Sequence, residues 1–284
     1  MTNSPHAAIQ QSMALSQSHY ENFPVASILL PRHLREPIGL IYAFARQADD
    51  FADEGDLTPE QRLALLDGFR QQLDLIAQGQ QPGVALFQAL KVMIEERGLP
   101  LQPFYDLLSA FSQDVIKARY ANFGEVIDYC RRSANPVGRL LLHLYGEATP
   151  RNLGLSDAIC TALQLINFLQ DVAIDTGKDR IYLPLDELQK YKVSEAQIMA
   201  HDPQGTWSLL MEFQINRTRR LLQSGAPLGV ILPGRIGMEM RMIIAGGERI
   251  LKKLHQHRGD VFNHRPVLKP RDWIYMCYRA VRKK

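Results

Sequence analysis

Cysteine is scarce in this sequence, and the few cysteines show no pairing pattern. The 284 residues include only Cys130, Cys160 and Cys277, and no two of them form a C-x-x-C pair. An odd, widely spaced set suits a reducing compartment better than a disulfide framework. We therefore expect each cysteine to be a small core residue rather than a nucleophile.

Long apolar runs and a large charge excess are also missing. No apolar run approaches the roughly 18 residues that a membrane span requires. The first residues of the chain lack the charged and apolar regions of a signal peptide. Lysine and arginine total 33 against 30 aspartates and glutamates, and this net charge of +3 is too small to indicate a nucleic acid partner. The sequence therefore predicts a cytoplasmic protein that does not bind nucleic acid.

What the sequence does contain is helical periodicity along most of its length. Hydrophobic residues make up 46% and charged residues 22%, which is typical of a globular protein with a sizeable core. No linker divides the chain, so we expect a flexible N-terminus over residues 1–14 and a single all-α domain over 15–284. The clearest helices are predicted at 37–55, 59–79, 83–97, 101–117, 164–175, 194–200, 203–224 and 235–256.

Three oxygen-bearing side chains recur every four residues near the middle of the chain. Asn167, Asp171 and Asp175 would share one narrow stripe of an α-helix, since each step of four advances about 400°. The intervening residues are mostly apolar, which predicts a largely buried helix. Two carboxylates at this spacing repel each other by roughly 0.2–0.5 kcal/mol when exposed and by more when buried. A hard divalent cation is the natural partner that would offset this repulsion.

A second segment repeats this design. Tyr42, Arg46, Asp49 and Asp53 are spaced by four, three and four residues, so they also share one helical stripe. A single acidic stripe is equally compatible with a solvated helix face. Two such stripes on apolar-rich helices indicate instead that both belong to one functional site. We expect the two helices to face each other across a cavity, where their carboxylates hold Mg²⁺ and the metal binds substrate phosphate.

A proline interrupts a third helical pattern, between residues 125 and 147. Pro136 lies beside Gly138, and an interior proline costs about 3 kcal/mol because it removes a backbone hydrogen bond. We expect a kink at this point. Kinks in buried helices often line cavities, and Tyr129 lies just before this one.

These motifs, in this order, resemble the squalene/phytoene synthase family. The chain carries D-D-x-x-D at 49–53, then Q-x-x-N-x-L-x-D-x-x-x-D at 164–175, followed by R-x-Y-L-P at 180–184. The resemblance covers roughly residues 17–280. It implies an all-α isoprenoid-synthase-type helical bundle around a central cavity. It also implies an enzyme that joins two prenyl diphosphates head to head or processes the resulting cyclopropyl intermediate.

The resemblance assigns roles to particular residues. It implies that Mg²⁺, as a cluster bound with diphosphate, is held by Asp49, Asp53, Asn167, Asp171 and Asp175, and that Tyr129 faces the reacting carbons. The residues that it places against the substrate and its diphosphate are His19, Asn22, Phe23, Tyr42, Arg46, Gln164, Phe168, Arg180 and Tyr182.

The branch of the family is indicated by one variant motif. Many members read Ala-Gly-Thr-Val-Gly where this chain reads Ala-Asn-Pro-Val-Gly at 134–138. That variant looks most like the hydroxysqualene synthases of bacterial hopanoid pathways. The likeness implies that presqualene diphosphate loses its diphosphate and that water quenches the rearranged cation, without NADPH.

Two other functions remain open. A condensing prenyltransferase of the same family would make presqualene diphosphate, squalene or phytoene. A non-catalytic helical assembly factor would keep the fold alone, although such a protein has no reason to retain four aspartates on two stripes.

The end of the chain differs in composition from the rest. Residues 271–284 hold five basic residues and one acid, together with Trp273, Tyr275 and Tyr278. A basic, aromatic segment suits the surface of an anionic membrane. We therefore expect peripheral contact with the inner face of the membrane, and other enzymes of the pathway are further candidate partners.

Overall fold

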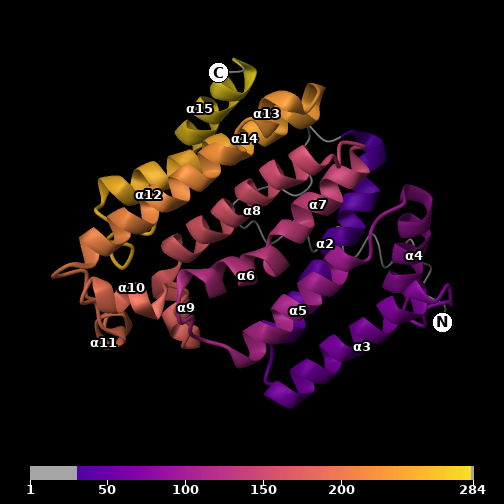
Figure 1. Ribbon diagram of the computed structural model, residues 1–284, viewed down its shortest axis with the longest axis horizontal. Helices are drawn as coiled ribbons and strands as arrows, with labels where there is room; N and C mark the ends of the chain where they lie inside the picture. Colours follow the sequence, from indigo (N-terminus) through magenta and orange to yellow (C-terminus); the bar gives the residue numbers. More distant parts are fainter. Residues whose placement is uncertain (1–30, 283–284) are drawn as a thin grey trace. The chain divides into compact units, whose positions relative to one another are not determined.

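The computed structural model describes residues 31–282, and every regular element in that range is a helix. The one β-type pairing there is an isolated parallel bridge between Arg119 and Ile181. The helices labelled in Figure 1 are α2 (Arg32–Asp53), α3 (Pro59–Ala77), α4 (Ala85–Arg97), α5 (Gln102–Ile116), α6 (Phe123–Ser133), α7 (Asn135–Leu144), α8 (Pro150–Gln170), α9 (Val172–Asp175), the 3₁₀ turn η1 (Thr176–Lys178), α10 (Leu185–Lys190), α11 (Glu195–Met199), α12 (Trp207–Gly225), α13 (Leu228–Ile231), α14 (Gly234–Gln256) and α15 (Pro270–Val281). The predicted all-α class is confirmed.

The described residues fall into two compact units, and neither is continuous in sequence. The first unit comprises the described residues up to Ile116 together with Asn135–Leu153, and the second comprises Lys117–Ala134 with the rest of the chain from Gly154. The first unit therefore holds α2, α3, α4, α5 and α7. The predicted flexible segment 1–14 lies outside the described residues.

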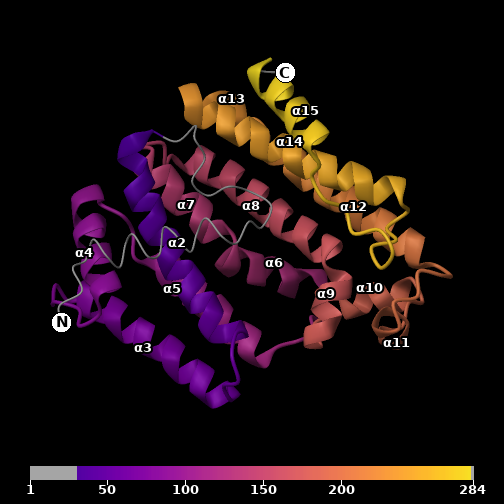
Figure 2. The same cartoon turned by 180° about the vertical axis from the view of Figure 1, so that it is seen from behind.

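The first unit is built around the apolar face of α2, which packs on α3, α4, α5 and α7 (Figure 2). Phe44 is fully buried at its centre, with ring centroids 5.8 Å from Phe69, 5.8 Å from Phe87 and 5.2 Å from Phe104. The Phe69 ring is stacked on Phe44 and the other two rings meet it edge to face, and both geometries add to the burial energy of aromatic rings. Because this face of α2 is buried, its opposite face is left to carry polar side chains.

Two predicted helix starts have different outcomes in the first unit. The start at Thr58 is confirmed by a capping box: the Thr58 amide donates to Gln61 Oε1 at 2.9 Å and the Gln61 amide donates to Thr58 Oγ1 at 3.4 Å. The start near Pro37 is wrong, because α2 begins at Arg32. Leu34 and Pro37 are both buried on the core side, so tertiary packing supports a turn that proline weakens.

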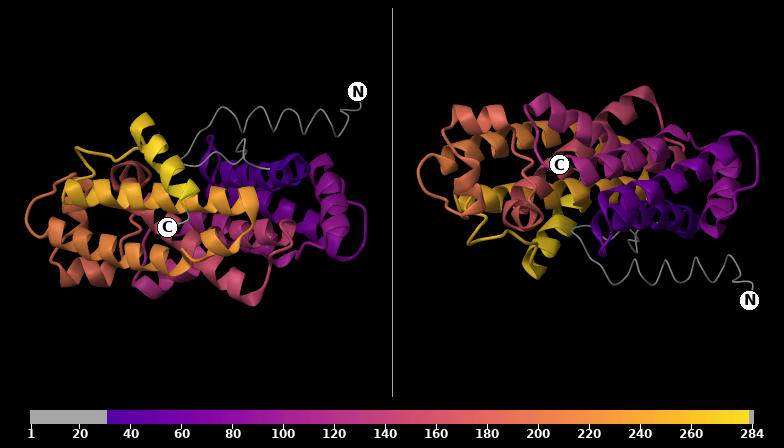
Figure 3. Two further views of the ribbon diagram at one scale, coloured as in Figure 1. Left: turned by 90° about the horizontal axis from the view of Figure 1, so that it is seen from above. Right: turned by 90° about the horizontal axis from the view of Figure 1, so that it is seen from below.

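The second unit places α14 between α12 and α15, with α13 also on α14 (Figure 3). Glycines allow its helices to approach closely. A Cβ atom at Gly225 would lie 2.6 Å from the side chain of Ile159, and one at Gly247 would lie 3.0 Å from that of Leu222. Larger residues at these positions would force α8, α12 and α14 apart.

The predicted kink near Pro136 is a complete break between two helices. α6 ends at Ser133, Ala134 lies between the helices, and α7 begins at Asn135. Pro136 is then the second residue of α7, where a missing amide proton leaves no hydrogen bond unmade. The proline therefore starts a new helix instead of bending a continuous one.

The cysteines are not all core residues. Cys130 is buried, and this burial raises the pKa of its thiol to about 12, so it stays protonated and unreactive at neutral pH. Cys160 is partly buried. Cys277, however, is exposed on α15, and the expectation of a core position is wrong for it.

In the described part of the chain, no single helix is long and apolar enough to span a membrane. Within residues 31–282, α8 and Val172–Lys178 together have enough length and apolar content, but the pair is bent by 68°.

α15 is attached to α14 through a buried carboxylate. Asp272 accepts hydrogen bonds from Arg249 Nη2 at 2.5 Å and from the Lys269 amide at 2.8 Å, and it also pairs with Lys253. Burial by itself raises the pKa of Asp272, but the bonds from Lys253, Lys269 and Arg249 outweigh it and hold that pKa well below its usual value of 3.8.

We predict that Asp272→Asn lowers the free energy of unfolding by about 3 kcal/mol, because it leaves two cations without their shared carboxylate. Since the folded-state pKa is lowered, the stabilisation is complete above pH 3.8 and is lost as the pH falls through the folded value. Urea denaturation at neutral and acid pH measures both effects. Asp56→Asn, at an exposed position, is the matched control, and equal stability of the two variants would contradict the prediction.

Candidate functional site

The acidic stripe of α2 is half-exposed and is compensated from within the helix. Tyr42, Arg46, Asp49 and Asp53 all lie on the partly accessible side of α2. Arg46 Nη1 lies 3.3 Å from Asp49 Oδ2, and Arg46 Nη2 lies 2.9 Å from Asp50 Oδ1. One guanidinium therefore contacts two neighbouring carboxylates, one of which, Asp50, lies off the predicted stripe. Arg46 therefore supplies part of the positive charge that these neighbouring carboxylates require.

The second acidic segment is not one straight helix. α8 ends at Gln170, Asp171 has backbone angles of φ −109° and ψ 13°, and α9 begins at Val172. The axis bends by 68° between Pro150–Gln170 and Val172–Lys178. The expectation that Asn167, Asp171 and Asp175 climb a single straight stripe is therefore wrong, because Asp175 lies beyond the bend. The amide of Asp175 still donates to the carbonyl oxygen of Asp171 at 2.8 Å, so one helical turn joins these two aspartates.

Contacts with a distant loop coincide with this bend. Arg265 Nε lies 2.6 Å from Asp171 Oδ1, across 94 positions of sequence. The residues next to this ion pair are also joined, since buried Gln170 donates from Nε2 to the carbonyl oxygen of Pro266 at 2.5 Å. Two adjacent residues of the helix end thus contact two adjacent residues of the loop. Arg265 is held against a predicted metal ligand by a two-point attachment.

The same loop is also anchored before Arg265, at Gly259 and Phe262. His201 Nε2 lies 2.9 Å from Thr176 Oγ1, and its ring stacks on Phe262 at 5.2 Å between centroids. Trp207, which is fully buried, donates from Nε1 to the carbonyl oxygen of Gly259 at 2.8 Å. These contacts hold the loop beside η1, directly after Asp175. The acidic segment is therefore supported on both sides of its bend.

Four aromatic rings from separate segments form one cluster in the second unit. Phe168 and Tyr182 stack with centroids 3.8 Å apart and planes 5° apart. Tyr129 lies 6.0 Å from Phe168 and 5.9 Å from Tyr182, and Tyr120 lies 5.6 Å from Tyr182. Three of these four residues are predicted site residues. Tyr120 is the fourth, and the sequence motifs do not predict it.

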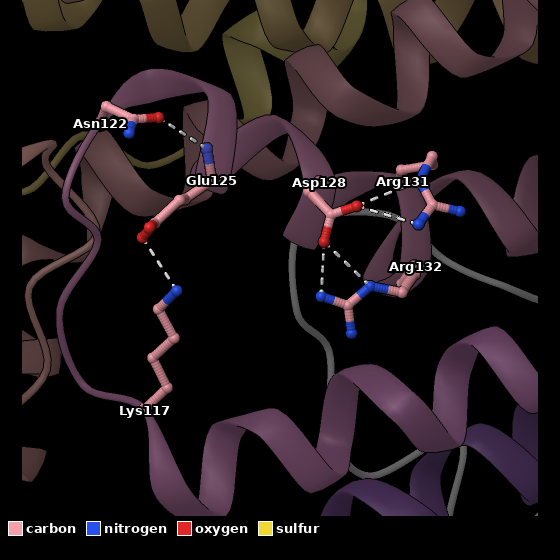
Figure 4. A network of polar contacts seen from close by, with 6 residues as sticks. All are labelled: Lys117, Asn122, Glu125, Asp128, Arg131 and Arg132. Atoms are coloured by element: carbon pink, nitrogen blue, oxygen red, sulfur yellow. Dashed lines mark hydrogen bonds and ion pairs between the residues drawn. The ribbon is translucent and has the colours of Figure 1, made fainter.

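The segment that carries Tyr120 is held in place by backbone and charge contacts. The amides of Ile181 and Leu185 donate to the carbonyl oxygens of Ala118 and Tyr120 at 3.0 and 2.9 Å. Lys117 Nζ lies 4.9 Å above the Tyr120 ring and 2.9 Å from Glu125 Oε2, the ion pair drawn in Figure 4. These contacts bring residues 117–121 alongside the R-x-Y-L-P motif.

The basic residues near Tyr129 are already paired. Asp128 receives Arg131 Nη2 at 2.9 Å and Arg132 Nη2 at 2.8 Å on its two oxygens (Figure 4). The hydrogen bonds from Arg131 and Arg132 lower the pKa of Asp128 below its usual value. Arg119 is likewise paired, with Asp179 and Glu195, each at 2.7 Å.

A narrow pocket opens beside Phe168 and Tyr182. Its apolar wall includes Leu165 and Val126, and its polar wall includes Arg217. Arg217 is itself committed, since its Nη1 lies 2.5 Å from Glu187 Oε1 and its guanidinium stacks 3.3 Å above the ring of Phe123. The polar wall of the pocket therefore holds a buried ion pair and not a free cation.

The donor set fits Mg²⁺ by its chemistry. Each acidic segment supplies two carboxylates, and the second also supplies the amide oxygen of Asn167, so all donors are hard oxygens. Among residues 31–282, no three His, Cys, Asp or Glu side chains are grouped closely enough to hold a metal on their own. Mg²⁺ commonly takes only one or two carboxylates and completes its coordination with phosphate and water, so the residues present are compatible with it.

The remaining predicted residues are located as follows. Gln164, Asn167 and Arg180 are partly buried, and the amide of Arg180 donates to the carbonyl oxygen of Asp175 at 2.9 Å. His19, Asn22 and Phe23 lie outside the described residues. Sequence reasoning missed Arg265, which lies in a loop without helical periodicity. Its only sequence signal is a basic residue that directly precedes a proline, in His-Arg-Pro.

Comparison with known proteins identifies the family. The chain matches the squalene/phytoene synthase family over residues 16–272. It belongs to this family. The predicted family and its enzyme class, which acts on prenyl diphosphates and generally depends on a divalent metal, are thereby confirmed.

Individual relatives cover nearly the whole chain. It is 40% identical to the hydroxysqualene synthase of Rhodopseudomonas palustris, over 92% of this chain and 88% of that protein. It is 30% identical to the phytoene synthase of Arthrospira platensis, over 88% and 85%. The crystal structure of squalene synthase HpnC from Alicyclobacillus acidocaldarius is similar at a TM-score of 0.82 and 33% identity, over 89% of this chain and 95% of that one.

We predict that Arg265→Gln tightens the binding of Mg²⁺ to the substrate-free protein roughly fivefold, because a neighbouring unit charge contributes about 1 kcal/mol of repulsion in a hydrated site. Isothermal titration calorimetry measures this affinity without any turnover. Arg258→Gln, in the same loop but exposed, is the control. Unchanged or weaker Mg²⁺ binding in Arg265→Gln would show that the arginine does not compete with the metal for Asp171.

Proposed function

We propose that this protein is a hydroxysqualene synthase, which converts presqualene diphosphate and water into hydroxysqualene and diphosphate. The observation that carries the proposal is that a chain of this family retains both acidic segments and also holds a cluster of mostly buried aromatic rings. Its greater identity with a hydroxysqualene synthase, 40% against 30% for a phytoene synthase, supports this branch.

The reaction begins with loss of diphosphate from the cyclopropylcarbinyl carbon. The carbon–oxygen bond breaks and its electron pair leaves on the diphosphate, which gains charge. Bound Mg²⁺ would neutralise that growing charge. On α2, Asp49 and Asp53 would hold the metal; at the α8–α9 bend, Asn167, Asp171 and Asp175 would do so. Arg46 and Arg180 would contact phosphate oxygens directly, as charge-assisted hydrogen bonds.

The cation that remains must be shielded until its skeleton has rearranged. Tyr129, Phe168 and Tyr182 offer ring faces, which stabilise a cation through their quadrupole. Tyr129 and Phe168 are only 4% and 7% exposed, so the rings keep bulk water away. After rearrangement, one water oxygen bonds to the cation and loses a proton. No electrons are transferred in this sequence, so it requires no NADPH.

A condensing prenyltransferase is the second candidate, because the named relatives include a phytoene synthase. Such an enzyme would form its carbon–carbon bond from two prenyl diphosphates and would use the same metal-binding residues. The two functions differ in the first substrate that they accept. Substrate choice therefore separates them without any knowledge of the quenching step.

We predict that purified protein with Mg²⁺ converts presqualene diphosphate to hydroxysqualene and that adding NADPH does not change the product. Mass spectrometry of extracted products, from presqualene diphosphate alone and from farnesyl diphosphate alone, measures this. Excess chelator should abolish turnover. Conversion of farnesyl diphosphate only, or formation of squalene with NADPH, would overturn the proposed function.

We also predict that Asp53→Asn and Asp175→Asn each lower kcat by roughly a hundredfold or more and raise the Mg²⁺ concentration needed for half-maximal rate, because each removes an anionic ligand. Glu54→Gln, which lies next to Asp53 but is exposed and off the stripe, should keep normal kinetics. Circular dichroism verifies that the variants are folded. A full rate in either aspartate variant would remove that residue from the metal site.

A further inference from the structure

α15 has two faces of different character. Asp272, Met276 and Ala280 are buried, and they are spaced by four residues on the side that packs on α14. On the outward side, Ile274, Tyr278 and Val281 are 73%, 52% and 69% exposed. These three residues follow the spacing i, i+4, i+7, so they form one apolar strip along the helix. Most apolar residues of this size are buried in a folded protein, and three in one strip form a patch.

Arginines flank this strip along one side. Arg271, Tyr275 and Arg282 follow the spacing i, i+4, i+11, which places them on the stripe next to Ile274 and Tyr278. Arg271, Arg279 and Arg282 are all exposed, and the Arg282 guanidinium lies 4.5 Å from the Tyr278 ring centroid. The one acid of the helix, Asp272, is buried and neutralised by α14. The outward face of α15 therefore carries basic, aliphatic and tyrosine side chains and no acid.

The apolar surface continues beyond α15. Arg241 of α14 donates from Nε to the carbonyl oxygen of Ala280 at 2.6 Å and from Nη1 to that of Gly229 at 2.5 Å. The residues after these two acceptors are Val281 and Val230, which are 69% and 60% exposed. One guanidinium thus brings the end of α15 next to α13, which adds a second exposed apolar element.

We propose that this outward face of α15, defined by Ile274, Tyr278, Val281 and the three flanking arginines, docks on the surface of an anionic lipid bilayer. An apolar strip beside a row of arginines matches the acyl boundary and the phosphates of such a surface. A second copy of the chain is a poorer match, because an isologous contact would place the arginines of both copies together. The helix lies on the membrane and does not span it.

The charge and apolar contributions can be tested separately. Each arginine near an anionic surface strengthens partitioning roughly fivefold, so the triple variant Arg271→Gln/Arg279→Gln/Arg282→Gln should bind phosphatidylglycerol-containing vesicles about a hundredfold more weakly than the unaltered chain. Its matched control is Arg97→Gln/Arg151→Gln/Lys252→Gln, at exposed positions elsewhere. Raised salt should weaken binding of the unaltered chain.

The apolar strip is tested by Ile274→Glu/Val281→Glu. These side chains are exposed, so the variant should fold normally, which its thermal melting curve checks. The control is Val92→Glu/Leu209→Glu, at apolar residues that are 53% and 54% exposed elsewhere. Vesicle flotation should show that only the α15 variant loses binding to anionic vesicles.

Exposed Cys277 provides a direct reporter of contact. In a Cys160→Ser background, an environment-sensitive fluorophore on Cys277 should shift to the blue with anionic vesicles and stay unchanged with phosphatidylcholine vesicles. Absence of the shift, equal binding to both lipids, or equal binding by the α15 variants and their controls would overturn the proposal. So would a concentration-dependent dimer that the Ile274→Glu/Val281→Glu variant disrupts, since a second copy would then cover this face.

Discussion

Carboxylates on partly buried helices require a nearby positive charge, and this requirement shapes both acidic segments. On α2 the charge is local, since Arg46 reaches Asp49 and Asp50 within one helical turn. At the end of α8 it comes from 94 positions away, through Arg265. In both places the protein chain holds acids that would otherwise repel each other. A divalent ion, bound together with the substrate's diphosphate, would supply further positive charge to these carboxylates.

The long-range contact also explains the local geometry. Gln170 and Asp171 are the last residue of α8 and the residue at the bend, and each contacts the loop at 265–266. A helix with no interior proline or glycine at this point would otherwise continue. Sharp bends generally have an identifiable cause, and here the attachment of the loop is the structural feature found at the bend. The separation of Asp175 from the α8 axis follows from it.

The aromatic cluster depends on connections of a different kind. Tyr129, Phe168 and Tyr182 come from α6, α8 and the R-x-Y-L-P segment, and the backbone bonds between 117–121 and 181–185 bring Tyr120 to the same rings. Packing of this density holds rings in one orientation, which suits a surface for a short-lived cation. The arrangement of α15 also depends on contacts between segments that are distant in sequence. Its single acid is buried against α14, so that only apolar and basic groups face outward.

Much of this protein is determined by local sequence. Thr58 and Gln61 form a helix cap through side chains three residues apart, and the spacing of Asp49 and Asp53 fixes their common side of α2, because both depend on contacts within one turn. The family could be read from motifs for the same reason. The start of α2, the bend at Asp171, the partner of that aspartate and the exposure of Cys277 were decided by tertiary structure. Each results from packing or ion pairs between distant residues, which periodicity within a segment does not encode.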